Sequence, residues 1–216
     1  TAIAGEPCNG HDRYWQSKRV IPSGQMDEAI RRELLGYAMI FTLPGVPCVY
    51  YGDEIGMRYV EGLTSVEGGY GRTGSRSPMQ WDSTTNAGFS SAPKEALYIR
   101  QDESADRPTA AAEMADENSL WHEINRLIEI RQSHKALLSK GEIEFVYAEK
   151  NEYPLAYVRS SGDEKILVII NPADREVSFE SNPSLGESIY SFGGKASAEN
   201  GIITVPAKSA GFYTVK

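Results

Sequence analysis

A short apolar run between two glycines constrains this chain more than any other stretch. Val46–Tyr51 contains no charged residue, and Gly45 and Gly52 bound it. Valine and tyrosine favour strands, and an uncharged run of this length is typical of a strand buried on both faces of a parallel sheet. Two acids, Asp53 and Glu54, come directly after it. Because the carboxyl ends of barrel strands carry the chemistry, the region after this run is a candidate site.

Helical periodicity lies on both sides of the predicted strand. Met26–Leu43 carries apolar residues at three- and four-residue spacing, and Pro44 ends it. Ser119–Leu138 is amphipathic, with Arg131 on the same face as its leucines and isoleucines. A helix, a Pro-Gly turn and a buried strand form the second half of a βαβ unit. With a possible strand before Asn9, the order predicts two consecutive strand–helix units.

The hydrophobic period changes to two at Gly141, which indicates strands. Short alternating runs follow, separated by turn residues such as Asn171-Pro172 and Asn200-Gly201. They predict strands at 143–147, 155–159, 166–170, 177–179, 188–192, 202–205 and 212–215. Such a series predicts a small antiparallel sandwich. We therefore expect an α/β segment over residues 1–140 and an all-β domain over residues 141–216.

Composition excludes several classes of partner. The 216 residues carry a formal net charge of −8, which argues against nucleic acid and acidic membranes, because phosphate binding needs a surplus of Lys and Arg. No apolar stretch approaches the roughly 18 residues of a membrane span. The two cysteines, Cys8 and Cys48, imply no disulfide framework, and unpaired thiols favour a cytoplasmic location.

Two polar segments are candidate binding loops. Asn9–Trp15 combines His11, Asp12 and Trp15 with the turn dipeptide Asn9-Gly10, so it is either a turn or a loop that binds hydroxyl groups. Arg58–Glu117 is long and irregular, which is typical of functional or disordered loops. Its aromatic residues favour an ordered, functional loop: Tyr70, Trp81 and Phe89. Its glycine-rich part lacks a nucleotide fingerprint.

The sequence predicts no metal and no cofactor. His122 and His134 lie on the second helix, where a solvated or core-edge histidine is the ordinary case. Cys8, His11 and Cys48 could be metal ligands, but no fourth ligand with suitable spacing is visible.

Several motifs resemble the α-amylase family of glycoside hydrolases (family 13). Gly45–Met57 resembles the eighth barrel strand of that family. Arg76–Asp82, with Asn86–Ser90, is similar to the loop after that strand in the oligo-1,6-glucosidase and α-glucosidase branch. His11-Asp12 is similar to the fourth conserved segment, at the end of the seventh strand. The resemblance implies the last two βα units of a (β/α)8 TIM barrel followed by a C-terminal β-sandwich.

The resemblance also assigns roles to individual residues. It makes Asp12 the carboxylate that stabilises the transition state and His11 a partner of a sugar hydroxyl. Trp15 and Arg76 become substrate contacts, although a structural ion pair is an equal alternative for Arg76. The first six barrel strands, with the nucleophile and the general acid, have no counterpart in this sequence. The resemblance therefore implies a parent enzyme that hydrolyses α-glucosidic bonds of oligosaccharides without a cofactor, and an isolated chain that is inactive.

Two other functions fit the same residues. The parent enzyme could be a glucosyltransferase or isomerase, because relatives in this branch differ mainly in loops. The chain could instead be a non-catalytic carbohydrate-binding or partner-binding module, in which Trp15, Tyr70 and Trp81 stack on sugar rings. Open barrel edges in either case predict self-association through Ala29–Tyr51, or else a rearrangement of Thr1–Leu43.

Overall fold

The computed structural model describes residues 26–68, 73–182 and 184–215, which divide into two compact units. The sheet unit contains residues 31–48 and 125–215, and the loop unit contains residues 26–30 and 49–124 without the gap at 69–72. The two units are not the segments 1–140 and 141–216 that the sequence predicts. The division into domains at residue 140 stays a prediction. None of the described helices is long and apolar enough to cross a membrane.

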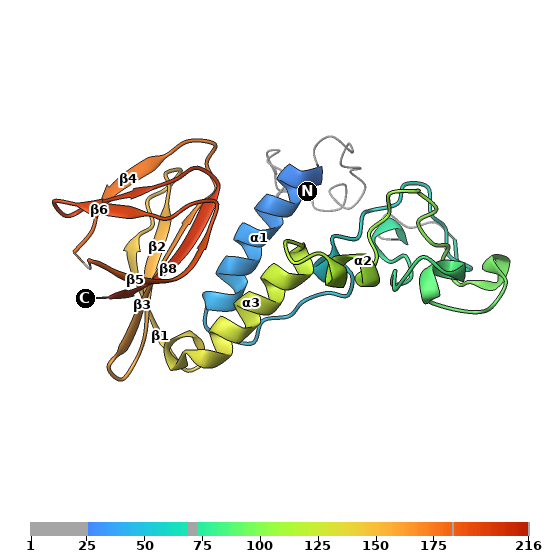
Figure 1. Cartoon of the computed structure of the whole chain (residues 1–216), viewed down its shortest axis with the longest axis horizontal. Coiled ribbons are helices and arrows are strands. Elements are labelled where there is room, and N and C mark those ends of the chain that lie inside the picture. Colours follow the sequence, from blue (N-terminus) through green and yellow to red (C-terminus); the bar gives the residue numbers. More distant parts are fainter. Residues whose placement is uncertain (1–25, 69–72, 183, 216) are drawn as a thin grey trace. The chain divides into compact units, whose positions relative to one another are not determined.

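The sheet unit holds two antiparallel sheets (Figure 1). The larger has the strand order β1-β2-β3-β8-β5 and the smaller has the order β4-β7-β6. This confirms the antiparallel sandwich that the alternating pattern predicts. The strands are β1 (Glu142–Tyr147), β2 (Leu155–Ser161), β3 (Glu164–Asn171), β4 (Val177–Glu180), β5 (Leu185–Phe192), β6 (Ser197–Glu199), β7 (Ile202–Val205) and β8 (Ser209–Val215). Only β6 among them was not expected, because its three residues are all exposed and carry no apolar alternation.

Three helices lie in the described chain: α1 (Met26–Thr42), α2 (Ala110–Ala115) and α3 (Leu120–Ser133). A turn of 3₁₀ helix, Lys135–Leu137, follows α3. The predicted helices Met26–Leu43 and Ser119–Leu138 are thus confirmed to within one or a few residues. The short helix α2 was missed, although the Thr109 hydroxyl caps it by accepting a hydrogen bond from Ala112 N at 3.2 Å.

The predicted strand at Val46–Tyr51 is wrong for this structure. These residues form an extended loop with no ladder partner among the described strands, and Val46 is 89% exposed. A buried parallel strand needs a hydrogen-bonding neighbour on each side. Neither neighbour exists in the described chain, so the expected eighth barrel strand does not form. The expected seventh strand, before Asn9, lies outside the described residues.

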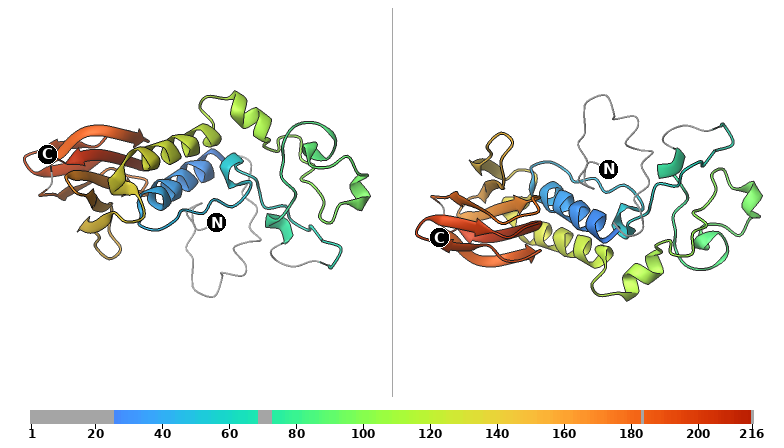
Figure 2. Two further views of the ribbon diagram at one scale, coloured as in Figure 1. Left: turned by 90° about the horizontal axis from the view of Figure 1, so that it is seen from below. Right: turned by 90° about the horizontal axis from the view of Figure 1, so that it is seen from above.

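Two buried arginines bind the end of α1 inside the sheet unit, where this end of α1 lies beside the sheets in both views of Figure 2. Arg131 of α3 donates to the carbonyl oxygens of Phe41 (2.6 Å), Leu43 (3.0 Å) and Gly45 (2.6 Å). Arg159 of β2 is fully buried and donates to the carbonyl oxygen of Thr42. The last carbonyls of a helix have no intrahelical partner, so these guanidinium groups satisfy them and place positive charge where the helix dipole favours it.

Arg159 also fixes the chain between α3 and β1. It donates to the carbonyl oxygens of Leu138 (2.8 Å), Gly141 (3.0 Å) and Glu142 (3.0 Å). A Cβ at Gly141 would lie 2.8 Å from the Arg159 Nη2 atom and 2.1 Å from the carbonyl oxygen of Ala136, so only glycine fits there. Burial lowers the pKa of Arg159, but a guanidinium stays charged in proteins.

A hydroxyl pair completes this contact. The Thr42 hydroxyl donates to the Ala38 carbonyl oxygen (2.6 Å), and it lies 2.6 Å from the Tyr157 hydroxyl. Because the threonine proton is already used, Tyr157 is the donor in the second bond. Burial raises the pKa of Tyr157 to about 12, so the phenol keeps the proton that it donates.

We expect Arg159→Met to destabilise the chain by at least about 3 kcal/mol, because several buried carbonyl oxygens lose their donor at about 1–3 kcal/mol each. The free energy of unfolding from urea denaturation measures this. The matched control is Arg175→Met, which changes an exposed arginine of the same unit and should stay within about 0.5 kcal/mol of the original chain. Equal losses in the two variants would contradict the role given to Arg159.

Candidate substrate-binding loop

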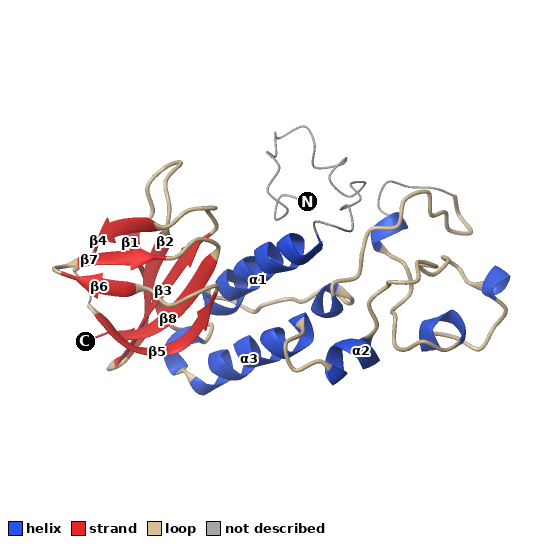
Figure 3. Cartoon of the chain, turned by 45° about the horizontal axis from the view of Figure 1, so that its top comes forward, coloured by secondary structure: helices blue, strands red, loops and turns tan. Residues whose placement is uncertain are grey.

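Only one of the four predicted site residues lies in the described structure. His11, Asp12 and Trp15 lie outside the described residues, as does Cys8. Arg76 is described and exposed. The geometry therefore concerns Arg76 and the loops that position it, in the irregular part of the loop unit (Figure 3).

A tight turn follows the Val46–Tyr51 run. Gly52 and Gly56 have φ values of 91° and 66°, and they flank the 3₁₀ turn Asp53–Ile55. A Cβ on Gly52 would lie 2.5 Å from the Met57 sulfur, so both the backbone and the space require glycine. The Glu54 carboxylate accepts a hydrogen bond from Gly52 N at 2.7 Å. Glu54 therefore braces the turn, as expected.

A small apolar cluster joins this turn to the predicted substrate loop. Ile55 is 2% exposed and packs with Met79 and Ala110, and the half-buried Met57 and Trp121 cover the cluster. Ile55 follows the expected strand, Met79 belongs to the Arg76–Asp82 motif and Ala110 begins α2. Three segments far apart in sequence thus meet at one point.

The positive charge of Arg76 acts on the Tyr51 side chain. The Tyr51 hydroxyl donates to the carbonyl oxygen of Ser77 at 3.1 Å. Burial, with the neighbouring Tyr50 ring, raises the pKa of Tyr51 to about 12, and the positive charge of Arg76 opposes that rise. The Arg76 backbone is held by a hydrogen bond from its N–H to the carbonyl oxygen of Thr73 at 3.0 Å. Its exposed guanidinium carries donors suited to hydroxyl or anionic groups.

The motif after Arg76 begins with four buried residues, 77–80, and ends at the exposed Trp81. Ser77 and Gln80 are buried, and the Gln80 amide donates to the carbonyl oxygen of Pro108 at 2.7 Å. Trp81 is 51% exposed, and its backbone N–H donates to the carbonyl oxygen of Ala87 at 2.8 Å. Phe89 is 49% exposed. Exposed rings on a hydrogen-bonded backbone offer flat apolar faces for a ligand.

Polar contacts that sequence reasoning missed order the rest of the loop. Arg58 donates to both carboxylate oxygens of Asp106 (3.0 and 3.1 Å), to Ser104 Oγ (2.6 Å) and to Asp102 (3.4 Å). The hydrogen bond from Arg58 lowers the pKa of Asp106. Gln101 donates to the carbonyl oxygen of Asn86 at 2.9 Å. These partners are 15 to 48 residues apart, so no local pattern could have paired them.

The described histidines have structural partners. His122 Nε2 lies 3.2 Å from the carbonyl oxygen of Met114, and His134 Nδ1 lies 2.7 Å from a carboxylate oxygen of Glu164. Over residues 26–68, 73–182 and 184–215, no three His, Cys, Asp or Glu side chains are grouped to hold a metal ion. Cys48 is exposed.

Comparison with known proteins identifies the family of these motifs. Residues 8–141 match the family described as "Alpha amylase, catalytic domain". The chain is 30% identical over 167 residues to a probable alpha-glucosidase of Rhizobium meliloti. The aligned region covers 73% of this chain and 29% of that protein. It is 34% identical over 145 residues to trehalose synthase of Thermus thermophilus. This aligned region covers 65% of this chain and 14% of that protein.

The fold of the chain agrees with solved structures. The trehalulose synthase MutB from Pseudomonas mesoacidophila superposes with a TM-score of 0.71 at 24% identity, over 85% of this chain and 38% of MutB. An isomaltulose synthase variant from Erwinia rhapontici superposes with a TM-score of 0.71 at 20% identity. The chain thus spans less than a third of the length of the two curated relatives named above. The match over residues 8–141 shows that the chain belongs to the alpha-amylase family, glycoside hydrolase family 13.

Proposed function

We infer that the chain is the C-terminal part of a retaining α-glucosidase-type enzyme that acts on α-glucosidic bonds of oligosaccharides. The family match over residues 8–141 carries this proposal, and the probable alpha-glucosidase of Rhizobium meliloti supports the substrate class. The exposed Arg76 and Trp81 support it further, because they present donors and an aromatic face on one loop. The expected cytoplasmic location stays a prediction.

The proposed chemistry divides the work between this chain and the rest of the enzyme. A retaining glycosidase needs two carboxyl groups about 5 Å apart, one as nucleophile and one as acid and then base. The resemblance assigns neither of these two carboxyl groups to this chain. It makes Asp12 a third carboxylate, which stabilises the positive charge of the oxocarbenium-like transition state. His11, Trp15 and Arg76 would hold the sugar ring and its hydroxyls.

In the full-length enzyme, Asp12→Asn should lower kcat by about 100-fold or more, because the neutral amide does not stabilise the developing positive charge as a carboxylate does. Steady-state kinetics with maltose and an aryl α-glucoside measure the change. Asp163→Asn is the matched control, since Asp163 is exposed in the turn between β2 and β3, and its kcat should be unchanged. An Asp12→Asn variant with the original kcat would remove Asp12 from the mechanism.

We expect the purified 216-residue chain to release no p-nitrophenol from p-nitrophenyl α-glucoside. One of three carboxylates cannot complete a double-displacement reaction. Hydrolytic activity above the rate in buffer alone would refute this, provided that the activity elutes with the chain through two chromatographic steps. A full-length enzyme from the same preparation serves as the positive control.

Isomerase activity of the parent enzyme is the second candidate. The trehalose synthase relative, at 34% identity, favours it. The products distinguish the two functions: a hydrolase converts maltose into glucose alone, whereas an isomerase returns mainly a second disaccharide.

A partner-binding role is the non-catalytic alternative. The chain is 31% identical over 142 residues to the amino acid transporter heavy chain SLC3A1 of Rattus norvegicus, which covers 61% of this chain. An intact protein that binds maltooligosaccharides, or a protein partner, without cleaving any glucoside would favour this role.

We also propose that the isolated chain self-associates through the exposed run next to α1. The apolar face of α1 contributes little, since Leu34, Ala38 and Phe41 are buried. The exposed apolar groups are instead Ile40 and Val46, with Tyr50 and Tyr51 nearly half exposed. An exposed extended segment with unpaired backbone groups is a template for pairing with another chain.

The substitution Val46→Lys should shift the chain toward monomer, because a charge in the contact opposes burial. Light scattering at several protein concentrations measures the mass. Val66→Lys is the matched control, since Val66 is a valine of similar exposure, 79%, that lies in the loop unit, whereas Val46 belongs to the sheet unit. A monomeric original chain at high concentration would contradict the proposal.

A further inference from the structure

The sheet unit has a cleft at one end of the space between its two sheets. Its volume is about 740 Å3, within the range of small-molecule sites. Strands β1, β2, β3 and β8 of the larger sheet line one side, and the ends of β4 and β7 line the other. All the described residues that line the cleft belong to the sheet unit, and none belongs to the predicted substrate loop at residues 76–90.

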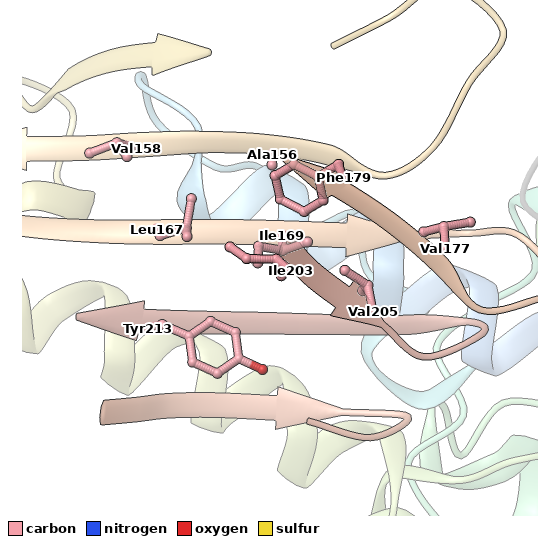
Figure 4. Packing of buried hydrophobic residues seen from close by; sticks show 9 residues of the cluster. All are labelled: Ala156, Val158, Leu167, Ile169, Val177, Phe179, Ile203, Val205 and Tyr213. Carbon is pink, nitrogen blue, oxygen red and sulfur yellow. The ribbon is translucent and has the colours of Figure 1, made fainter. Parts of the chain in front are cut away.

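The floor of the cleft continues the apolar core between the sheets. Val158 of β2 belongs to that core and lies at one end of it (Figure 4). Val146 of β1 and Val215 of β8 pack against the same core, are half-buried and also line the cleft. The floor therefore offers branched aliphatic groups to the apolar face of a bound molecule.

Two charged side chains face the cleft from the larger sheet. Glu144 of β1 is the cross-strand partner of Val158, and such partners share a face of the sheet. Lys165 lies two residues before the core residue Leu167, so it points to the same face of β3. Among the described residues, neither charged side chain has an ion-pair or hydrogen-bond partner. Because β2 lies between the two strands, about 10 Å separates the charges.

The opposite rim carries two amides beside a tight hairpin turn. Asn200 and Gly201 have φ values of 52° and 79° and form the two-residue turn between β6 and β7. Ser181 N donates to the carbonyl oxygen of Gly201 at 3.0 Å, which holds this turn beside the end of β4. Asn182 and Asn200, the residues next to this bond, line the cleft, and their amides have no hydrogen-bond partner in the described chain. Each amide offers both donors and an acceptor.

We propose that this cleft binds a neutral oligosaccharide of two or more glucose rings. A sugar hydroxyl donates to the Glu144 carboxylate or accepts from the Lys165 ammonium group, and the two amides bind hydroxyls in either way. An anion would be repelled by Glu144 and a cation by Lys165, so a neutral molecule with many hydroxyls fits both charges. A single sugar ring is shorter than the distance between them, so two rings are needed. The choice of glucose rests on the proposed function, because the parent enzyme is proposed to act on α-glucosidic oligosaccharides.

Nuclear magnetic resonance of the isotope-labelled 216-residue chain, titrated with maltotetraose, tests the proposal. We expect the backbone amide signals of Glu144, Ser181 and Gly201 to shift and saturate. Glucose should bind at the same signals about 10-fold or more weakly, because one ring does not reach both charges. Shifts confined to residues 76–90 would place the sugar on the predicted substrate loop and overturn the proposal.

Two variants of exposed residues test the charged groups. Lys165→Met and Glu144→Ala should each weaken the binding of maltotetraose about 5-fold or more, because a hydrogen bond to a charged group is lost. Lys195→Met is the matched control, since Lys195 is an exposed lysine of the same unit that does not line the cleft, and its dissociation constant should be unchanged. Equal affinity in Lys165→Met and Lys195→Met would overturn the proposal, as would no saturable shift at the cleft up to about 20 mM maltotetraose. Because the readout is binding, a negative result leaves the proposed glycosidase activity of the parent enzyme untouched.

Discussion

Two buried guanidinium groups hold the sheet unit together at the end of α1. All the hydrogen bonds described for Arg131 and Arg159 go to backbone carbonyl oxygens, several of them in the last turn of α1 and the loop that follows it. Removing a guanidinium from water is costly, and burial lowers the pKa of both groups. The cost is offset because the donors reach carbonyl oxygens, and those of Phe41, Thr42 and Gly141 would otherwise be buried without a partner.

This arrangement fixes the start of the sandwich as well as the end of the helix. Arg159 is a residue of β2, and its neighbours in the strand, Ala156 and Val158, face the other sheet (Figure 4). There they meet Phe179 of β4 and Ile203 of β7. One face of β2 therefore builds the apolar core between the sheets, and the other face binds the polar end of α1. A strand with two such different faces is consistent with the period of two along its side chains.

The loop unit is organised differently, and this bears on function. Its apolar cluster is small, with Ile55, Met79 and Ala110 as its buried members. Side chains that bind backbone carbonyls or carboxylates add to the hydrogen bonds of its backbone, among them Gln80, Gln101 and Arg58. Loops of this kind carry binding groups at their surface while buried polar anchors fix the backbone. The exposed groups Arg76 and Trp81 are products of that construction.

The sequence by itself determined the local elements. The spacing of apolar residues located α1 to within one residue and the start of α3 to within one residue, although α3 ends five residues before the predicted end. The change of period at Gly141 located almost every strand of the sandwich. The motif Arg76–Asp82 also pointed to the family that the comparisons show. These features could be predicted because each depends on neighbours within a few positions along the chain.

Tertiary structure decided everything that depends on distant partners. Val46–Tyr51 has the composition of a buried strand, yet it forms a loop, because a strand exists only when adjacent strands supply its hydrogen bonds. Arg159 lies in a run of strand residues, and nothing near it in sequence indicates that it binds the end of a helix 117 residues earlier. Gln101 belongs to no motif, and the hydrogen bond from its amide to the carbonyl oxygen of Asn86 forms only in the folded chain, where the two residues meet.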